Sequence, residues 1–248
     1  MTAARVSVIV PSFNQRQFIE QALESIFAQD IAVEVFVQDG GSTDGTAAVL
    51  KRWENRLAGW TSRKDAGQAA AINEGMNRGS APYVCWLNSD DMFEDGGLAT
   101  LAEALEASTA PAVYGRTWDI FDDQSTRKAT WVQSFSRARL AKRCIVSQPG
   151  TLIRRSVWEA VGGLDPHLHM ALDYDLWWRI YNQFGPLKFV DSFVASNRIH
   201  SMTKTSRFRR RHYDEAIKVV RTHHGRVPLK WFLAQPYRVW IKSGFREL

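Results

Sequence analysis

The first hundred residues alternate between short apolar runs and segments whose apolar residues recur at helical spacing. Residues 6–10, "VEVFVQD" (33–39) and "PYVCWL" (82–87) are rich in β-branched or aromatic residues, which is typical of buried strands, and a weaker run covers 58–61. Residues 15–29, 46–53 and 67–79 predict helices with one buried face. Because strands alternate with helices over short links, we expect an α/β fold with a mainly parallel sheet flanked by helices.

Beyond Gly97 the alternation is looser. We expect a helix over 98–106, a strand over 111–115, a polar stretch over 119–128, a strand and short helix within 147–165, an amphipathic helix over 172–185 and a strand over 187–200. In the amphipathic helix, Leu176, Trp177, Ile180 and Phe184 are predicted to face inward. With no repeat or clear linker, one domain over residues 1–205 and a helical appendage over 206–248 is the simplest organisation.

Composition and cysteine usage favour a globular protein of a reducing compartment. A chain of 248 residues, 45% of them hydrophobic, is long enough to bury a core. Cys85 and Cys144 give no disulfide framework and no metal-binding pair, and Cys85 reads as a small core residue. No run approaches the ~18 apolar residues of a membrane span, and no signal peptide is recognisable. We therefore expect a cytoplasmic location.

The net charge of +6 is concentrated in the last forty-odd residues, beginning at "RFRRRH". We find no zinc spacing, RRM-type motif or persuasive helix-turn-helix, so no nucleic-acid partner is expected. The basic segment also contains aromatic and apolar residues, namely Trp231, Phe232, Tyr237, Trp240 and Ile241. This mixture favours peripheral contact with an anionic membrane on the cytoplasmic face. The alternative is that these side chains pack on the catalytic domain or on a second subunit of a homo-oligomer.

Four polar loops follow the four predicted strands: "PSFN", "QDGGSTD", "RKDAGQ" and "NSDD". In parallel sheets, ligands bind outside the carboxyl ends of the strands, so these loops are expected to form one site. Asp90 and Asp91 could bind Mg²⁺ or Mn²⁺, or one of them could cap the next helix. Asp39 can accept hydrogen bonds from a base or a ribose, whereas Asp44 is expected to have a structural role.

Six segments in order resemble the family 2 glycosyltransferases, which are inverting enzymes of the GT-A fold: "VSVIVPSFNQ", "VQDGGSTDGT", "KDAGQAAAIN", "LNSDD", "QPGTLIRRSVWEAVGGLD" and "DYDLWWR". The resemblance covers about residues 6–200. It implies transfer of a sugar from a nucleotide diphosphate sugar, with UDP- and dTDP-sugars favoured, to a hydroxyl of a glycan or a lipid-linked acceptor. It also implies inversion, a divalent metal cofactor (Mn²⁺ or Mg²⁺) and a role in cell-surface polysaccharide biosynthesis.

The resemblance also assigns residues to the donor and metal sites by matching position. His200 is expected at the metal with Asp90, which is the last acid of the DxD motif, and Asp91 is a secondary candidate. Asn88 stands where the family usually has the first acid of that motif. Because an amide carries no charge, the protein is expected to offer the metal less negative charge and to bind it less strongly. The nucleotide site is expected to contain Pro11, Ser12, Asn14, Asp39, Lys64, Asp65, Gln68, Asn88 and Ser89.

The same resemblance identifies Asp173 as the catalytic base, with Asp175 as a second choice, although Leu172 stands where the family often has another acid. Without the family, capping of the helix by Asp173 would be the favoured interpretation. Arg198 and His200 match residues that return over the diphosphate or the metal. Gln148 matches a segment that faces donor sugar or acceptor.

Three alternatives stay open. Trp177 and Trp178 could stack on a sugar, although helical spacing favours a core position for Trp177. A sugar-phosphate nucleotidyltransferase also uses a nucleotide-binding α/β sheet, but "PSFNQRQF" lacks the Gly- and Arg-rich phosphate loop of that class. A non-catalytic nucleotide- or glycan-binding relative remains open because of Asn88 and Leu172.

Overall fold

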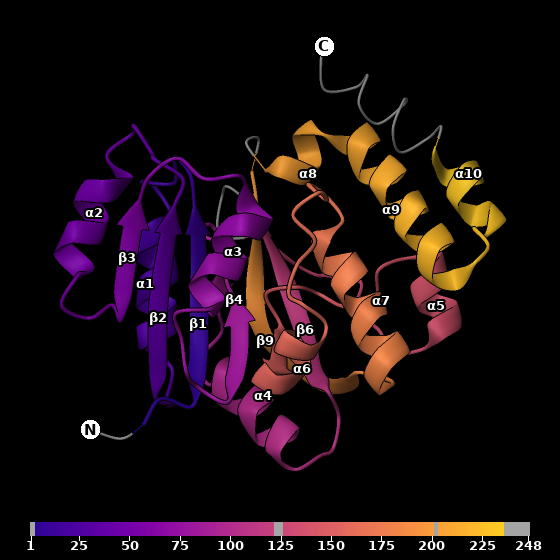
Figure 1. The fold of residues 1–248 in the computed structure, drawn as a ribbon, viewed down its shortest axis with the longest axis horizontal. Helices are drawn as coiled ribbons and strands as arrows, with labels where there is room; N and C mark the ends of the chain where they lie inside the picture. Colours follow the sequence, from indigo (N-terminus) through magenta and orange to yellow (C-terminus); the bar gives the residue numbers. More distant parts are fainter. Residues whose placement is uncertain (1–2, 122–125, 201–202, 236–248) are drawn as a thin grey trace.

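The computed structural model describes residues 3–121, 126–200 and 203–235 (Figure 1). Its strands are β1 (Val6–Ser12), β2 (Val33–Asp39), β3 (Gly59–Ser62), β4 (Tyr83–Trp86), β5 (Met92–Phe93), β6 (Ala112–Phe121), β7 (Arg127–Ala129), β8 (Thr151–Arg154) and β9 (Lys188–Ile199). Its helices are α1 (Ile19–Phe27), α2 (Thr46–Trp53), α3 (Gln68–Met76), α4 (Gly97–Glu106), α5 (Arg137–Lys142), α6 (Arg155–Ala160), α7 (Leu172–Phe184), α8 (Lys204–Arg207), α9 (Arg209–His224) and α10 (Leu229–Gln235).

The strands form one sheet in the order β3-β2-β1-β4-β8-β6-β9-β5, with β7 paired to β6. Strands β3, β2, β1 and β4 are mutually parallel, which confirms the predicted βαβ half. In the second half, β8 is antiparallel to β4 and β6, while β6 and β9 are parallel. The carboxyl ends of β1 to β4 therefore meet at the upper edge in Figure 1.

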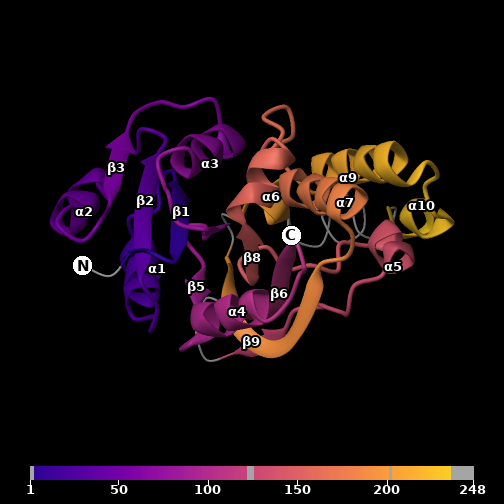
Figure 2. The same ribbon diagram turned by 60° about the horizontal axis from the view of Figure 1, so that its bottom comes forward.

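Side-chain alternation along the strands builds a core on each face of the sheet. Ile9 and Trp86 point to the face covered by α3, α6 and α7. Val8, Val10 and Cys85 point to the face covered by α1, α2 and α4. Figure 2 shows these two helical layers on either side of the strands. Burial on both faces explains why the parallel strands read as continuous apolar runs, and it confirms Cys85 as a core residue.

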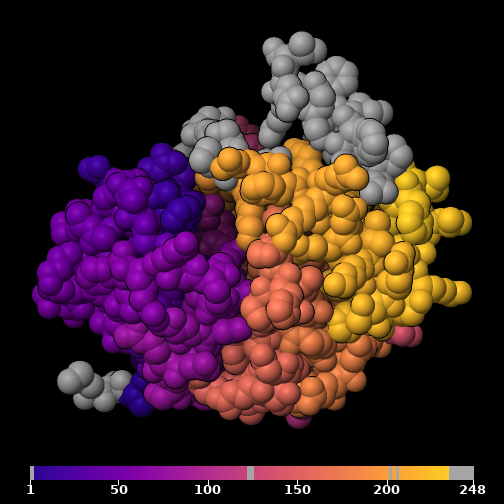
Figure 3. Space-filling view, turned by 45° about the horizontal axis from the view of Figure 1, so that its top comes forward, coloured from indigo at the N-terminus to yellow at the C-terminus, as the bar shows by residue number. Residues whose placement is uncertain are grey.

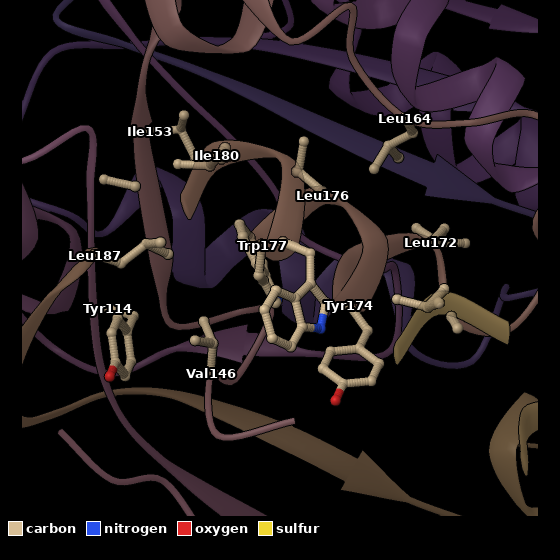
Figure 4. Close-up of a cluster of buried hydrophobic side chains, with 14 of the residues drawn as sticks. Tyr114, Val146, Ile153, Leu164, Leu172, Tyr174, Leu176, Trp177, Ile180 and Leu187 are labelled. Atoms are coloured by element: carbon tan, nitrogen blue, oxygen red, sulfur yellow. The ribbon is translucent and has the colours of Figure 1, made fainter. Parts of the chain in front are cut away.

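Helix α7 lies in the larger core cluster, with Trp177 at its centre (Figure 4). Leu176, Trp177 and Ile180 are fully buried, as the spacing predicts. The prediction for Phe184 is wrong, because this residue ends α7 and is 41% exposed. Trp178 is also fully buried and stacks on His223, so both tryptophans are core residues and not sugar platforms.

The C-terminal helices pack on α7, and Ala216, Val219 and Val220 of α9 share its core cluster. Trp231 of α10 is buried, and its indole N–H donates to the carbonyl of Ala141 (2.8 Å). For Trp231 the packing alternative therefore holds, and the expected membrane contact is wrong. Phe232 is 45% exposed, whereas Tyr237, Trp240 and Ile241 lie outside the described residues.

The polar stretch 119–128 is not simply a loop, because β6 continues to Phe121 and pairs with β7 from residue 127. In the part of the chain that the structure describes, no helix is long and apolar enough to cross a membrane.

Gly97 marks a close approach between α4 and the backbone of β9. A Cβ added there would lie 2.2 Å from the carbonyl oxygen of Val194, whereas one at neighbouring Gly96 would meet nothing within 4 Å. Gly97→Ala is therefore expected to cost about 3 kcal/mol of unfolding free energy or more. The control Gly96→Ala should cost only about 1 to 2 kcal/mol for its left-handed backbone. Urea unfolding of both variants checks this, and equal losses would contradict the close approach.

Candidate active site

The polar loops after β1 to β4 lie together along one edge of the sheet. The space-filling view turned toward that edge shows the N-terminal half, from indigo to purple, meeting the orange segments beyond residue 150 (Figure 3). The loops arrive there because four parallel strands end on the same side. The predicted nucleotide residues are therefore brought together from segments spread between Pro11 and Ser89.

Hydrogen bonds around Asp39 fix the turns after β1 and β2. Its carboxylate accepts from the backbone N–H and hydroxyl of Ser42 and from the hydroxyl of Ser62. Asn14, at φ +53°, accepts from the N–H of Thr43 (2.9 Å), and its own N–H donates to the Ser42 hydroxyl. Asp44 accepts from the Arg16 and Thr46 amides, which confirms its structural role. Asp39 thus holds the loop that borders the predicted nucleotide pocket.

Phe13 and Asp65 lie on either side of Gly40. A Cβ at Gly40 would be 3.1 Å from a carboxylate oxygen of Asp65 and 3.3 Å from the Phe13 ring, so any side chain there would crowd both groups. Phe13 is 61% exposed although it is a large aromatic residue. Asp65 accepts from the Gly67 N–H at the start of α3, and Lys64 is exposed beside it.

A chain of side-chain amides crosses the site from Gln148, which lies before β8, to α8. Gln148 donates to the Trp86 carbonyl (2.7 Å), so its oxygen is left to accept from Asn88 (3.1 Å). The Asn88 oxygen then accepts from Gln68 (2.8 Å), whose own oxygen accepts from the Lys204 ammonium (3.1 Å). Because a backbone carbonyl can only accept, it sets the orientation of every amide along the chain.

Asp91 is a buried structural residue. One carboxylate oxygen accepts from the Arg198 backbone N–H and the other from the Asn88 amide. Burial, and secondarily the charge of Asp90, raises the pKa of Asp91 well above its usual range. Arg198 is also buried, and its guanidinium donates to the Asp90 carbonyl and to the side-chain oxygen of Gln21 on α1. Neighbouring Ser89 and, on β1, Pro11 and Ser12 are likewise buried.

Asp90 projects from the same loop toward His200 at the end of β9. Its carboxylate lies 3.1 Å from the His200 Nε2, and the His200 ring contacts Phe18. Among the described residues no group of three or more His, Cys, Asp and Glu side chains is arranged to hold a metal ion. One carboxylate with a histidine nevertheless fits Mg²⁺ or Mn²⁺, because such ions take their remaining ligands from water and substrate phosphates.

Asp173 stands in the first turn of α7, half-buried beside Cys144. Burial raises the pKa of Asp173 to about 6, although the backbone amides of Asp173 and Tyr174 act in the opposite direction. A carboxylate with this pKa is ionised at neutral pH and is a stronger base than an exposed aspartate.

Asp175 has a different environment two residues later. It accepts from His223 of α9 and from Arg179 (both 2.7 Å). Burial alone would raise the pKa of Asp175, but the hydrogen bond from His223 and the charge of Arg179 outweigh burial and lower it. Asp175 therefore ties the appendage to α7.

Three residues that lie at or next to the site were not identified from the sequence. Phe13 could have been suspected as an aromatic residue in a polar loop after a strand. Lys204 is hidden in a run of basic residues. Glu215 of α9 accepts from the backbone N–H groups of residues 169, 170 and 171, which lead into α7 and Asp173. No local sequence signal connects Glu215 with that loop.

The family model described as "Glycosyl transferase family 2" matches residues 7–162, more than half of the chain. The chain belongs to glycosyl transferase family 2. It is 29% identical over 179 residues to an uncharacterized glycosyltransferase of Mycobacterium tuberculosis, covering 70% of this chain and 68% of that relative. It is also 26% identical over 201 residues to a hyaluronan synthase of Pasteurella multocida, covering 79% of this chain but only 20% of that relative. The protein is thus a glycosyltransferase, as the sequence predicts.

Solved structures confirm the GT-A fold. The Staphylococcus aureus TarS fragment 1-349 in complex with UDP-GlcNAc matches with a TM-score of 0.74 at 17% identity, covering 97% of this chain and 75% of that one. The Pyrobaculum calidifontis mannosyltransferase PcManGT, in complex with GDP-Man and Mn²⁺, matches with a TM-score of 0.65 at 22% identity, covering 97% and 68%. The family match ends before Asp173, Arg198 and His200, so the roles of these residues do not follow from it.

Proposed function

We propose that this glycosyltransferase moves a sugar from a nucleotide diphosphate sugar, with UDP- and dTDP-sugars favoured, to a hydroxyl of a glycan or lipid-linked acceptor. The observation that carries the proposal is the placement of Asp90–His200 and of the Asp39 and Asp65 turns along one edge of the sheet. Transfer is proposed to proceed by a single displacement with inversion at the anomeric carbon. The product is proposed to enter cell-surface polysaccharide.

The nucleotide pocket is proposed to lie between the turns after β1 and β2. The exposed Phe13 ring offers a face for stacking on the base, and Gly40 leaves room beside it. The Ser12 hydroxyl is buried and has no hydrogen-bond partner among the described residues, which is costly unless a ligand satisfies it. Asp39 and Asp65 hold the two turns that border this space.

Asp90 and His200 are proposed to hold the divalent metal. When bound, the metal supplies positive charge against the diphosphate leaving group. Lys204 reaches the donor side through Gln68 and places a further positive charge near Asn88. Asp173 is proposed to accept the proton of the attacking acceptor hydroxyl from the face opposite the leaving diphosphate.

Membership of a glycosyltransferase family disfavours a nucleotidyltransferase. A non-catalytic relative remains the competing proposal, because Asn88 and Leu172 replace residues that the family usually has as acids. The raised pKa of Asp173 in the first turn of α7 supports the enzyme, because it suits a general base.

Incubation of the purified protein with a panel of nucleotide sugars, with Mn²⁺ or EDTA, tests the proposal. We expect release of nucleoside diphosphate from one donor, dependent on metal. Tight nucleotide binding in calorimetry without turnover of any donor, in the presence of glycan and lipid-linked acceptors, would favour the non-catalytic relative.

Asn88→Asp tests why an amide stands in the metal-binding motif. The new carboxylate would face Asp91 and the Gln148 oxygen, to which Asn88 now donates, so the metal-free protein should lose about 1 to 3 kcal/mol of stability. The added charge should instead tighten Mn²⁺ binding in the presence of UDP. Thermal unfolding in EDTA and calorimetric Mn²⁺ titration measure the two effects, and unchanged Mn²⁺ affinity would place Asn88 away from the metal.

A further inference from the structure

A cluster of arginines surrounds a surface hollow where α8 meets α9. The hollow, here called the arginine hollow, is lined by Arg207, Phe208, Arg209, Arg210, Arg211 and Asp214. Phe208 is 49% exposed among these cations. An exposed aromatic ring surrounded by guanidinium groups combines an apolar insertion point with charges that attract phosphate.

The acids of this region do not neutralise it. Residues 203–235 contain nine Lys and Arg residues against two acids, so this segment alone exceeds the net charge of +6 of the whole chain. Asp214 lies 4.0 Å from Arg210, and both side chains are largely exposed. Glu215 pairs with Arg211 and also accepts three backbone N–H groups. The excess positive charge is therefore available to a partner.

The position of the arginine hollow connects it with the donor site. Lys204 contacts Gln68, and Arg207 follows Lys204 by one helical turn on α8. In Figure 1, α8 lies at the upper end of β9, to the right of the edge at which β1 to β4 end. A flat anionic surface that met the hollow would thus lie close to the opening of the donor site.

We infer that the arginine hollow is a docking surface for an anionic membrane, through lipid headgroup phosphates at the arginines and insertion of Phe208. The inference rests on the proposed function in one respect, because the membrane would present the lipid-linked acceptor. It also narrows the membrane contact expected from the sequence, which covered the whole segment beginning at "RFRRRH". The buried Trp231 is excluded from that contact, and the junction of α8 and α9 is kept.

Co-sedimentation of the full chain with vesicles tests this docking. We expect binding to phosphatidylcholine mixed with phosphatidylglycerol, and none to phosphatidylcholine alone. At about 1 M salt, where the Debye length falls to about 3 Å, binding should largely disappear. The triple variant Arg207→Gln, Arg209→Gln, Arg210→Gln should bind roughly a hundredfold more weakly, because each cation near such a surface contributes about a factor of five. Arg211 is left intact because it pairs with Glu215.

A matched variant removes the same charge elsewhere. Lys51→Gln, Arg52→Gln, Lys188→Gln changes three exposed cations outside α8 and α9 and should alter vesicle binding by less than about threefold. Equal losses in both triple variants, or no binding by the wild-type protein at low salt, would overturn the inference. So would saturable binding of inorganic phosphate or of RNA at the hollow without vesicle binding.

These outcomes are separable from failure of the proposed function. Vesicle binding is measured without donor, and donor hydrolysis is measured without vesicles. We expect all three proteins to hydrolyse the donor at the same rate, because none of the exchanged residues belongs to the proposed donor, metal or base sites. A protein that binds vesicles but turns over no donor would leave the docking surface standing and remove the enzyme mechanism.

Discussion

Asp173→Asn is expected to lower the turnover number for donor hydrolysis and for sugar transfer by about two to four orders of magnitude. The amide keeps the size of the side chain but cannot accept the proton of the attacking hydroxyl. Donor affinity should stay nearly unchanged, because the predicted nucleotide residues lie on other loops. Steady-state kinetics and calorimetric binding of the nucleoside diphosphate separate the two effects. Retention of full turnover would show that Asp173 is not the base.

The pKa of about 6 gives the sign of the pH dependence. The base must be ionised, so the wild-type rate should fall as the pH is lowered through about 6. The free energy of unfolding has the opposite pH dependence, because Asp173 holds its proton more tightly in the native state than in the unfolded chain. The stabilisation from the protonated form is present below the unfolded pKa and is lost as the pH rises through about 6. Asp173→Asn should therefore be more stable than wild type at pH 8, by roughly 2 to 3 kcal/mol.

Asp175→Asn is the matched control on the same helix turn. It removes a carboxylate that accepts from His223 and Arg179, so it should destabilise the protein at neutral pH. Turnover per folded molecule should fall far less than in Asp173→Asn. A larger loss of turnover in Asp175→Asn would exchange the roles of the two acids.

Asp90→Asn is expected to abolish tight Mn²⁺ binding in the presence of UDP and to lower turnover at least a hundredfold. Asp90 is proposed as the carboxylate ligand, and the other proposed protein ligand is the imidazole of His200, which brings no negative charge. Loss of the charge on the leaving-group side removes several kcal/mol of transition-state stabilisation. Calorimetric Mn²⁺ titration and donor hydrolysis measure the two quantities.

Asp91→Asn is the control for Asp90→Asn. The Asp91 carboxyl is buried between the Arg198 N–H and the Asn88 amide, so it is not available to an ion held by Asp90 and His200. Mn²⁺ affinity should change by less than about threefold in this variant, while its stability changes. Similar losses of affinity in both variants would mean that the metal lies between the two acids.

The parallel half of the fold could be predicted from the sequence because its strands are buried on both faces and its helices have one apolar face. The β2 bounds agree residue for residue. The second half of the fold was harder to predict from the sequence, because β6, β8 and β9 pair with segments far away in the chain. The predicted burial of Phe184 is wrong for a local reason, because helical spacing does not show that the last turn of α7 extends beyond the core.

The site was predictable to the extent that strand ends gather in parallel sheets. Asp39 and Asp65 come from two loops, and Asn88 and Asp90 share a third, so the sheet brings three separate segments to one edge. The family resemblance ranked Asp90 above Asp91 and Asp173 above Asp175. The contacts that hold Asp91 and Asp175 were not predictable, because their partners come from β9 and α9. The contacts of Lys204 and Glu215 depend on the folding back of α8 and α9, and no spacing in the chain encodes that.

The stereochemistry of donor hydrolysis tests the single-displacement mechanism most directly. In the proposed site, Asp173 activates water or an acceptor hydroxyl on the face opposite the diphosphate. With an α-linked nucleotide sugar from the donor panel, ¹H NMR spectra recorded before mutarotation should show the β-anomer of the free sugar appearing first. First appearance of the α-anomer would contradict inversion and the placement of Asp173 as the base.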